Sequence, residues 1–228
     1  MQGTTPSRLR GIAAVLLGAA TAACTAAAAP PRNPAPVGAE EAARIASARP
    51  DSGRYPWTEA DARFMTMMIH HHAQAIVMAR LAPTHDASPS VRTLAGRVIN
   101  AQQDEIATMR QWLIDRGQAA PVPSEELYHG NAGHHGHEAL MPGMLSNEQL
   151  ARLDAARGAE FDRLFLTFMI QHHRGATEMV RELFSHPGAG EDETVFKFAS
   201  DVNVDQETEI ARMQKMLAEL IFGPAPQP

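Results

Sequence analysis

A twenty-residue segment occurs twice in the chain, and this repeat constrains the fold more than any other feature. Residues 61–80 read DARFMTMMIHHHAQAIVMAR, and residues 162–181 read DRLFLTFMIQHHRGATEMVR. At a constant offset of 101, ten of the twenty positions are identical. Both copies contain two adjacent histidines among methionines. Such self-similarity indicates one structural unit used twice.

The repeat continues downstream of each copy. Residues 102–113 read QQDEIATMRQWL and match QETEIARMQKML, residues 206–217, at six of twelve positions. Apolar residues recur at spacings of three and four, which is typical of amphipathic helices. Thr58 and Ser88 are suitable helix N-caps, and Gly117 and Gly223 are suitable stops. The predicted helices cover about residues 58–82, 88–117, 147–184 and 191–220.

Each repeat is therefore predicted to be a helical hairpin, and the fold class all-α. No stretch shows the alternation of a β-strand. Because one hairpin cannot bury its apolar face alone, the two should close as a four-helix bundle. The bundle would span residues 57–222, with hairpin 1 at 57–117, a His/Met-rich loop at 118–146 and hairpin 2 at 147–222. A chain of 228 residues with 44% hydrophobic content can supply that core.

The N-terminus is predicted to be a signal peptide, residues 1–23. Arg8 and Arg10 precede an Ala/Leu-rich run, and small residues lead into Cys24. Cys24 lies where a lipid would be attached, although ordinary cleavage near residues 26–28 is the alternative. The run is too short and alanine-rich for a transmembrane helix. Residues 24–56, rich in Ala and Pro, are predicted to be a flexible tether.

Export restricts the chemistry. With one cysteine, the chain has no internal disulfide and no thiolate metal site. Removal of Arg8 and Arg10 leaves 18 basic against 26 acidic residues, a net charge of −8. Nucleic acid is therefore a poor candidate partner. The expected partners are a metal ion and, through Cys24, a membrane facing outside the cytoplasm, and homo-oligomers stay open.

The histidine doublets are the main candidates for a function. Adjacent helical residues point about 100° apart, so both members of a doublet can face the bundle interior. Each partner helix offers a glutamate and a methionine on one face. The candidate metal-binding residues are His71, His72, His172, His173, Met68, Met109, Met169, Met213, Glu105 and Glu209. The glutamates could be ligands, or could orient the imidazoles.

The choice of metal depends on which ligands join the imidazoles. Imidazole with thioether favours copper, particularly Cu(I), whereas imidazole with carboxylate suits Zn, Fe or Mn equally. The di-iron bundles need a Glu-x-x-His motif on two helices. Neither doublet has that glutamate, because the preceding positions are Met68 or Ile69 and Met169 or Ile170. A metal-dependent oxidoreductase is thus the weaker reading.

A structural alternative also stays open. Each histidine could donate to Glu105 or Glu209 across the bundle and only fix the register of the hairpins. A duplicated polar layer in an apolar core is hard to explain by packing alone, so metal binding is the preferred hypothesis. The methionines could equally be adaptable core residues.

The strings MIHHHAQAIVMA and MIQHHRGATEMV, each followed by a helix with Q-x-x-E-I-A-x-M, resemble the secreted bacterial family called domain of unknown function 305. The resemblance covers about residues 61–220. It implies a ferritin-like four-helix fold, and similarity to copper-binding periplasmic members implies metal binding or copper tolerance. The family's doublet falls on His71, His72, His172 and His173. The second copy departs in having Thr177 and Glu178 where the first has Ile76 and Val77.

The loop adds a second candidate metal tract. It carries His129, His134, His135 and His137, with Met141 and Met144. The tract could bind a soft metal or be a solvated polar loop. Lone His85 and His186 are expected to cap helix ends. Taken together, the sequence predicts an exported, copper-binding lipoprotein for sequestration, tolerance or transfer, and favours a binder over an enzyme.

Overall fold

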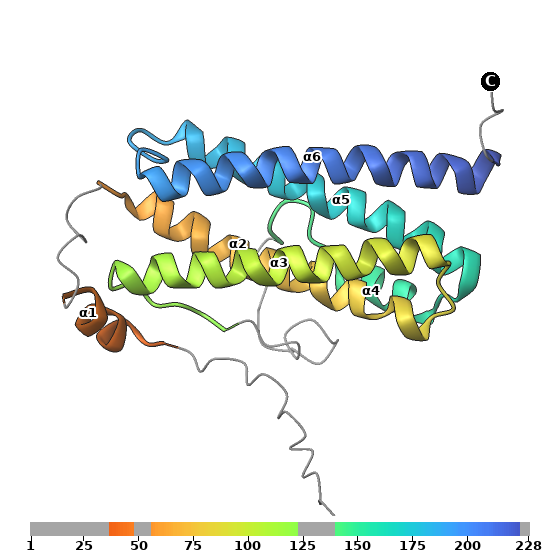
Figure 1. Cartoon of the computed structure of the whole chain (residues 1–228), viewed down its shortest axis with the longest axis horizontal. Coiled ribbons are helices and arrows are strands. Elements are labelled where there is room, and N and C mark those ends of the chain that lie inside the picture. Colours follow the sequence, from red (N-terminus) through yellow and green to blue (C-terminus); the bar gives the residue numbers. More distant parts are fainter. Residues whose placement is uncertain (1–36, 48–55, 123–139, 224–228) are drawn as a thin grey trace, which may run out of the picture. The chain divides into compact units, whose positions relative to one another are not determined.

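A computed structural model describes residues 37–47, 56–122 and 140–223, and these are helical throughout apart from turns and one isolated bridge between Val37 and Ala120. The all-α prediction is confirmed for this part of the chain. The elements are α1 (Ala39–Ser47), α2 (Glu59–Arg80), the 3₁₀ helix η1 (Ala82–Thr84), α3 (Pro89–Asp115), α4 (Asn147–Ala155), α5 (Gly158–Ser185) and α6 (Glu193–Phe222). Figure 1 shows the four long helices α2, α3, α5 and α6.

The long helices pair as two hairpins. Helix α2 packs along α3, α5 packs along α6, and α2 and α5 contact each other between them. Thr58 begins α2 with a capping box that includes Asp61, and Ser88 caps α3 directly before Pro89. These caps lie where the sequence places them, because each satisfies backbone N–H groups that the first helical turn leaves unpaired.

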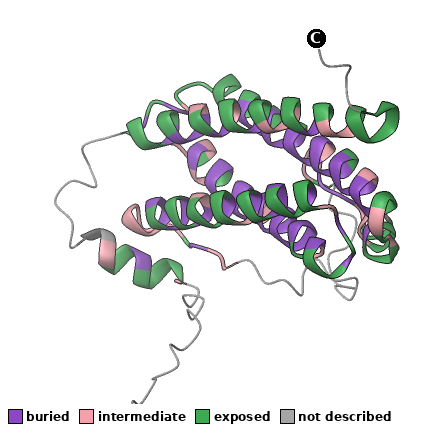
Figure 2. Ribbon diagram, turned by 45° about the vertical axis from the view of Figure 1, so that its right-hand side comes forward, coloured by how far each residue is buried: buried purple, intermediate pink, exposed green. Residues whose placement is uncertain are grey.

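The apolar core has two main clusters, each with residues from all four long helices, and a small third one of Ala73, Val77 and Met144. One cluster contains Leu94 of α3, Phe165 of α5 and Met213 of α6. The other contains Phe64 of α2, Trp112 of α3 and Phe198 of α6. Figure 2 shows where the buried residues lie along the ribbons of these helices. The middle turns of the helices, between the two clusters, are where the histidines lie.

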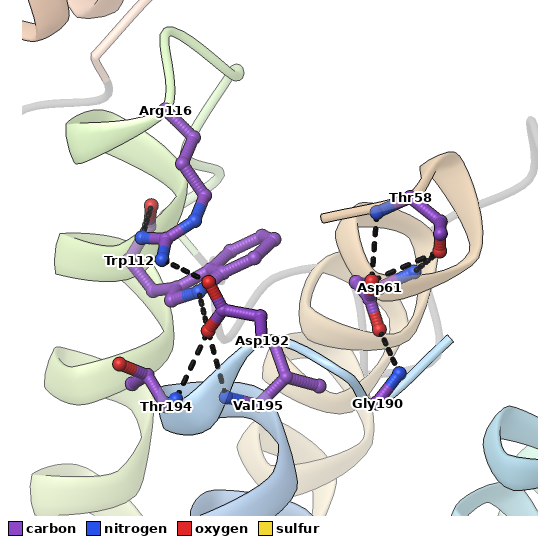
Figure 3. Close-up of polar contacts among 8 residues, drawn as sticks. All are labelled: Thr58, Asp61, Trp112, Arg116, Gly190, Asp192, Thr194 and Val195. Atoms are coloured by element: carbon purple, nitrogen blue, oxygen red, sulfur yellow. Dashed lines mark hydrogen bonds and ion pairs between the residues drawn. The ribbon is translucent and has the colours of Figure 1, made fainter. Parts of the chain in front are cut away.

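Repeated aspartates connect the two hairpins. The buried carboxylate of Asp61 accepts from the backbone N–H of Gly190, in the turn of the other hairpin, at 2.7 Å (Figure 3). Its repeat equivalent, Asp162, accepts from the N–H of Ser88 at 3.1 Å. Each hairpin thus holds the interhelical turn of the other, which explains why the repeat begins with an aspartate.

A third buried aspartate joins α3 to the start of α6. Asp192 caps α6 and accepts from Trp112 Nε1 at 3.1 Å. It also forms an ion pair with Arg116, whose guanidinium lies over the Trp112 ring (Figure 3).

Two sequence expectations differ from the structure. The helix predicted for residues 147–184 is two helices, α4 and α5, because Ala156 and Arg157 are extended and Gly158 adopts a φ of 58°, which glycine tolerates at little cost. The segment predicted to be a tether contains α1, which packs on α3 with Ala42 fully buried. Over the described ranges, none of the helices combines the length and apolarity needed to cross a bilayer.

Candidate metal centre

The four repeated histidines lie together in the middle of the core. His71, His72, His172 and His173 each have no exposed surface. The α2 doublet lies between Met68, which belongs to one cluster, and Ala75, which belongs to the other. The α5 doublet lies in the same way between Met169 and Ala176. The early residues of α2 share a cluster with the late residues of α5, so the two helices run antiparallel and their doublets meet at the crossing.

The two inner histidines stack on each other. The ring centroids of His71 and His172 are 3.8 Å apart, with an interplanar angle of 37°. The outer rings are farther away, with centroids 6.4 Å apart for His71 and His72 and 6.3 Å for His172 and His173. The doublets therefore form one layer, with the inner pair at its centre.

Each outer histidine faces a glutamate of its own hairpin. His173 Nε2 donates to Glu209 Oε2 at 2.6 Å. His72 Nε2 lies 2.7 Å from Glu105 Oε2, although these atoms are not aligned for a hydrogen bond. The glutamate side chains are 19% and 25% exposed for Glu105 and Glu209. Of the four histidine and two glutamate side chains described, the two glutamates are the ones with exposed surface.

The inner histidines differ from each other. His71 Nε2 lies 3.0 Å from the carbonyl oxygen of Pro142, and because a carbonyl can only accept, the imidazole donates. A neutral imidazole has one N–H, so the Nδ1 atom of His71 carries a lone pair. His172 has no partner for either nitrogen. The linker before α4 therefore breaks the symmetry of the repeat.

The layer collects polar atoms that lack hydrogen bonds. Within the described residues, every buried side-chain nitrogen or oxygen without a partner belongs to this layer, except Nε of Arg116. The layer atoms are His71 Nδ1, His72 Nδ1 and Nε2, His172 Nδ1 and Nε2, His173 Nδ1, Gln102 Nε2 and Oε1, Glu105 Oε2 and Gln206 Oε1. Each such atom costs about 1–3 kcal/mol when buried alone. A cluster of them indicates a water or ion that belongs there.

Burial keeps the inner imidazoles neutral. Loss of solvation, followed by repulsion from His72, lowers the pKa of His71 from 6.5 to about 3. Burial, followed by the neighbouring imidazole of His71, holds the pKa of His172 well below 6.5. Neutral imidazole is the form that binds metals.

The donor set fits a metal only in part. Across residues 37–47, 56–122 and 140–223, no three His, Cys, Asp or Glu side chains are grouped so that they could hold one ion. Fully buried methionines lie one helical turn from the layer: Met68 and Met109 in one core cluster, Met169 and Met213 in the other. Imidazole and thioether together suit Cu(I), whereas zinc is almost always held by three or four N, S or O ligands from His, Cys or carboxylate.

The structure adds residues that the sequence analysis did not select. Gln102 and Gln206 complete the layer, and their signal was the repeated Q-x-x-E spacing. Asp205 lies near the two glutamates of the layer. Partial burial raises its pKa most, followed by repulsion from Glu105, Asp201 and Glu209. Pro142 acts through its backbone, so no side-chain pattern could have revealed it.

The other candidates lie elsewhere. Cys24, His129, His134, His135 and His137 are outside the described residues. Met144 of the loop tract is buried against Ala73 and Val77, with Met141 beside it. His186 caps the end of α5 by donating to the carbonyl of Glu182, whereas His85 contacts Thr84 and Asp154.

The chain is thus an all-helical protein of two repeated hairpins that enclose a histidine layer. It belongs to the DUF305 family, a domain of unknown function whose model matches residues 61–217. A DUF305 fragment from Deinococcus radiodurans is 27% identical, with a TM-score of 0.59, over 72% of this chain and 99% of that one. A DUF305 protein from Streptomyces coelicolor, described as secreted, is 26% identical with a TM-score of 0.58, over 74% and 98%.

Copper-bound proteins are among the similar structures. CopM in its Cu(II)-bound form is 28% identical with a TM-score of 0.55, over 70% of this chain and 96% of that one. The Cu(I)-bound form of CopM is 27% identical with a TM-score of 0.54, over 74% and 100%. No protein of curated function matches the sequence.

Proposed function

We propose that this chain is an exported protein that binds copper in its histidine layer, for sequestration, tolerance or transfer of the ion. The observation that carries the proposal is the set of buried imidazole nitrogens without partners. Similarity to CopM, crystallised with copper, supports the choice of metal.

The available nitrogens have the properties of ligands. His71 and His173 use Nε2 for a hydrogen bond to a carbonyl or carboxylate oxygen and leave Nδ1 free. Metal-binding histidines commonly donate their other nitrogen in this way, which sets the tautomer and the ring orientation. We therefore assign Glu209 and Glu105 to orienting His173 and His72, and the Nδ1 atoms to the metal.

The methionines favour copper over its competitors. Among the described residues, too few imidazoles and carboxylates are grouped to hold an ion by themselves, so we assign thioethers from Met68, Met109, Met169 or Met213 as additional ligands. Thioether ligands select Cu(I) over Zn, Fe and Mn.

A structural role is the competing proposal, and the two His–Glu contacts favour it. In that case the layer would only fix how the hairpins meet. A purely structural role explains the hydrogen bond of His173 Nε2. It does not explain why both ring nitrogens of His172 are buried without a hydrogen-bond partner.

Copper content decides between these roles. The domain is purified, loaded with Cu(I) under reducing conditions, desalted and analysed by mass spectrometry, for the natural sequence and for the His71→Ala/His72→Ala/His172→Ala/His173→Ala variant. We expect copper to be lost in the variant. His70→Gln is the matched control, because Gln171 occupies that position in the second repeat. Unchanged stoichiometry in a folded quadruple variant would eliminate the site.

Residues 1–23 and Cys24 complete the proposal as an export signal and a lipid attachment point. Their composition supports this role. Cys24→Ala should move the protein from the membrane fraction to the soluble extracytoplasmic fraction. Equal membrane association of both forms would remove the anchor from the proposal.

A further inference from the structure

The segment 141–145, which ends the linker between the hairpins, lies directly on the histidine layer. The Pro142 carbonyl reaches His71 Nε2 at 3.0 Å, as described above. Met144 packs against Ala73 and Val77 of α2 on the same side. The segment is therefore part of the surroundings of His71.

Gln74 of α2 holds this segment by two hydrogen bonds. Its Nε2 donates to the carbonyl of Leu145 at 3.0 Å, and its Oε1 accepts from the N–H of Leu145 at 2.7 Å. Gln74 is 2% exposed, so both bonds are shielded from water. A side-chain amide that pairs with both backbone groups of one residue fixes that residue in position.

Gly175 of α5 makes room for the segment from the opposite side. A Cβ atom at this position would lie 1.9 Å from the Pro142 oxygen and 2.6 Å from the Gly143 Cα atom. Any side chain at 175 would therefore displace the carbonyl. Gln74 and Gly175 occupy the same position in the two repeats, 101 residues apart. The first copy therefore binds the segment through a side-chain amide, and the second leaves space for it by having no side chain.

We infer that Pro142 is a positioning residue for His71: its carbonyl, held by Gln74 and admitted by Gly175, sets His71 as the Nε2–H tautomer and turns the Nδ1 lone pair toward the layer. This inference rests on the proposed function for its consequence, copper binding at Nδ1. The tautomer itself is a property of the metal-free protein. The Pro142 carbonyl bonds to His71 and not to His172, so the two inner histidines are not interchangeable.

The tautomer can be read directly from ring-nitrogen chemical shifts of the ¹⁵N-labelled metal-free protein. We expect His71 to be the Nε2–H tautomer in the natural sequence, and Gly175→Ala to shift it toward Nδ1–H or to a mixture. The matched control is Gly96→Ala on α3, where a Cβ would meet nothing within 4 Å. A Nδ1–H tautomer in the natural protein, or an unchanged tautomer in folded Gly175→Ala, would overturn the inference.

Gln74→Met provides a second variant in case Gly175→Ala does not fold, because it removes both bonds to Leu145 without adding bulk. It should likewise increase the Nδ1–H population, and an unchanged population would count against the inference.

Copper affinity measures the consequence. In competition with a Cu(I) chelator, Gly175→Ala and Gln74→Met should bind about 10–100-fold more weakly than the natural protein, as loss of an outer-shell partner does at other metal sites. Equal affinity despite a changed tautomer would contradict the positioning role. If the natural protein binds no copper, the proposed function fails, whereas the nitrogen shifts still decide the tautomer.

Discussion

Four imidazoles in one apolar core create a problem at the scale of single residues, because each ring brings two polar nitrogens out of water. In the layer, His71 Nε2 is hydrogen-bonded to a carbonyl and His173 Nε2 to a carboxylate. The remaining ring nitrogens are left without a hydrogen-bond partner. The chemistry of the layer therefore follows from which nitrogens are already used.

The pH dependence of the metal-free domain follows from His71. The unfolded chain takes up a proton at this residue below pH 6.5, whereas the folded chain resists until pH approaches 3. Stability from His71 is thus complete above pH 6.5 and is lost as the pH falls through this window. His71 should contribute about 2 kcal/mol to the loss in free energy of unfolding between pH 7 and pH 5, and His172, whose pKa is lowered in the same direction, adds to that loss.

Urea unfolding at the two pH values measures this loss. His71→Gln provides the comparison, since it cannot titrate and should show a smaller loss. An equal loss in the variant would assign the pH dependence to other groups.

Glu209 should orient His173 without binding the metal. Glu209→Gln removes the charged acceptor, so Cu(I) affinity should fall about 10–100-fold at unchanged stoichiometry. Competition with a Cu(I) chelator gives the affinity. Glu207→Gln, an exposed position on the same helix, is the control and should bind as the natural protein does. Loss of stoichiometric copper in Glu209→Gln would make the carboxylate a ligand instead.

At the scale of elements, polar clamps hold the hairpins in register. Asp61 and Asp162 bind the turn of the opposite hairpin, and Asp192 ties the end of α3 to the start of α6. Because the doublets must meet at the crossing of α2 and α5, these clamps also determine where the histidines lie.

Asp192→Ala tests the importance of the clamps. The substitution leaves Arg116, whose side chain is 13% exposed, and Trp112 Nε1 without their acceptor. It should cost about 3–5 kcal/mol, as expected when one partner of a buried ion pair is removed. Urea denaturation measures the effect. Asp201→Ala, which breaks an exposed pair with Lys197, should change stability by less than about 0.5 kcal/mol. A loss below about 1 kcal/mol for Asp192→Ala would mean that the clamp is dispensable.

The elements also show where sequence reasoning ends. The repeat and the caps predicted the long helices well, because periodicity and capping are local. The break before α5 depends on a single glycine, Gly158, that the periodic pattern spans without interruption. Helix α1 was missed because its Ala-rich composition resembles a linker, and its burial depends on α3.

On the scale of the whole molecule, the histidine layer lies between the two main apolar clusters of the core. The sequence predicted that both histidine doublets face the bundle interior, and the full burial of all four rings agrees with that, because helical spacing places them on the same stripe as the apolar residues of their own helices. It could not predict that the linker would supply a carbonyl to His71 and none to His172, because that contact is made by backbone distant in the sequence. The ferritin-like connectivity stays a prediction.

Copper K-edge X-ray absorption of the Cu(I)-loaded domain tests the central claim most directly. We predict a first coordination shell of imidazole nitrogen with thioether sulfur, and no copper edge from the desalted quadruple histidine variant. A spectrum with only oxygen ligands, or one that the four substitutions leave unchanged, would contradict a copper site in the histidine layer.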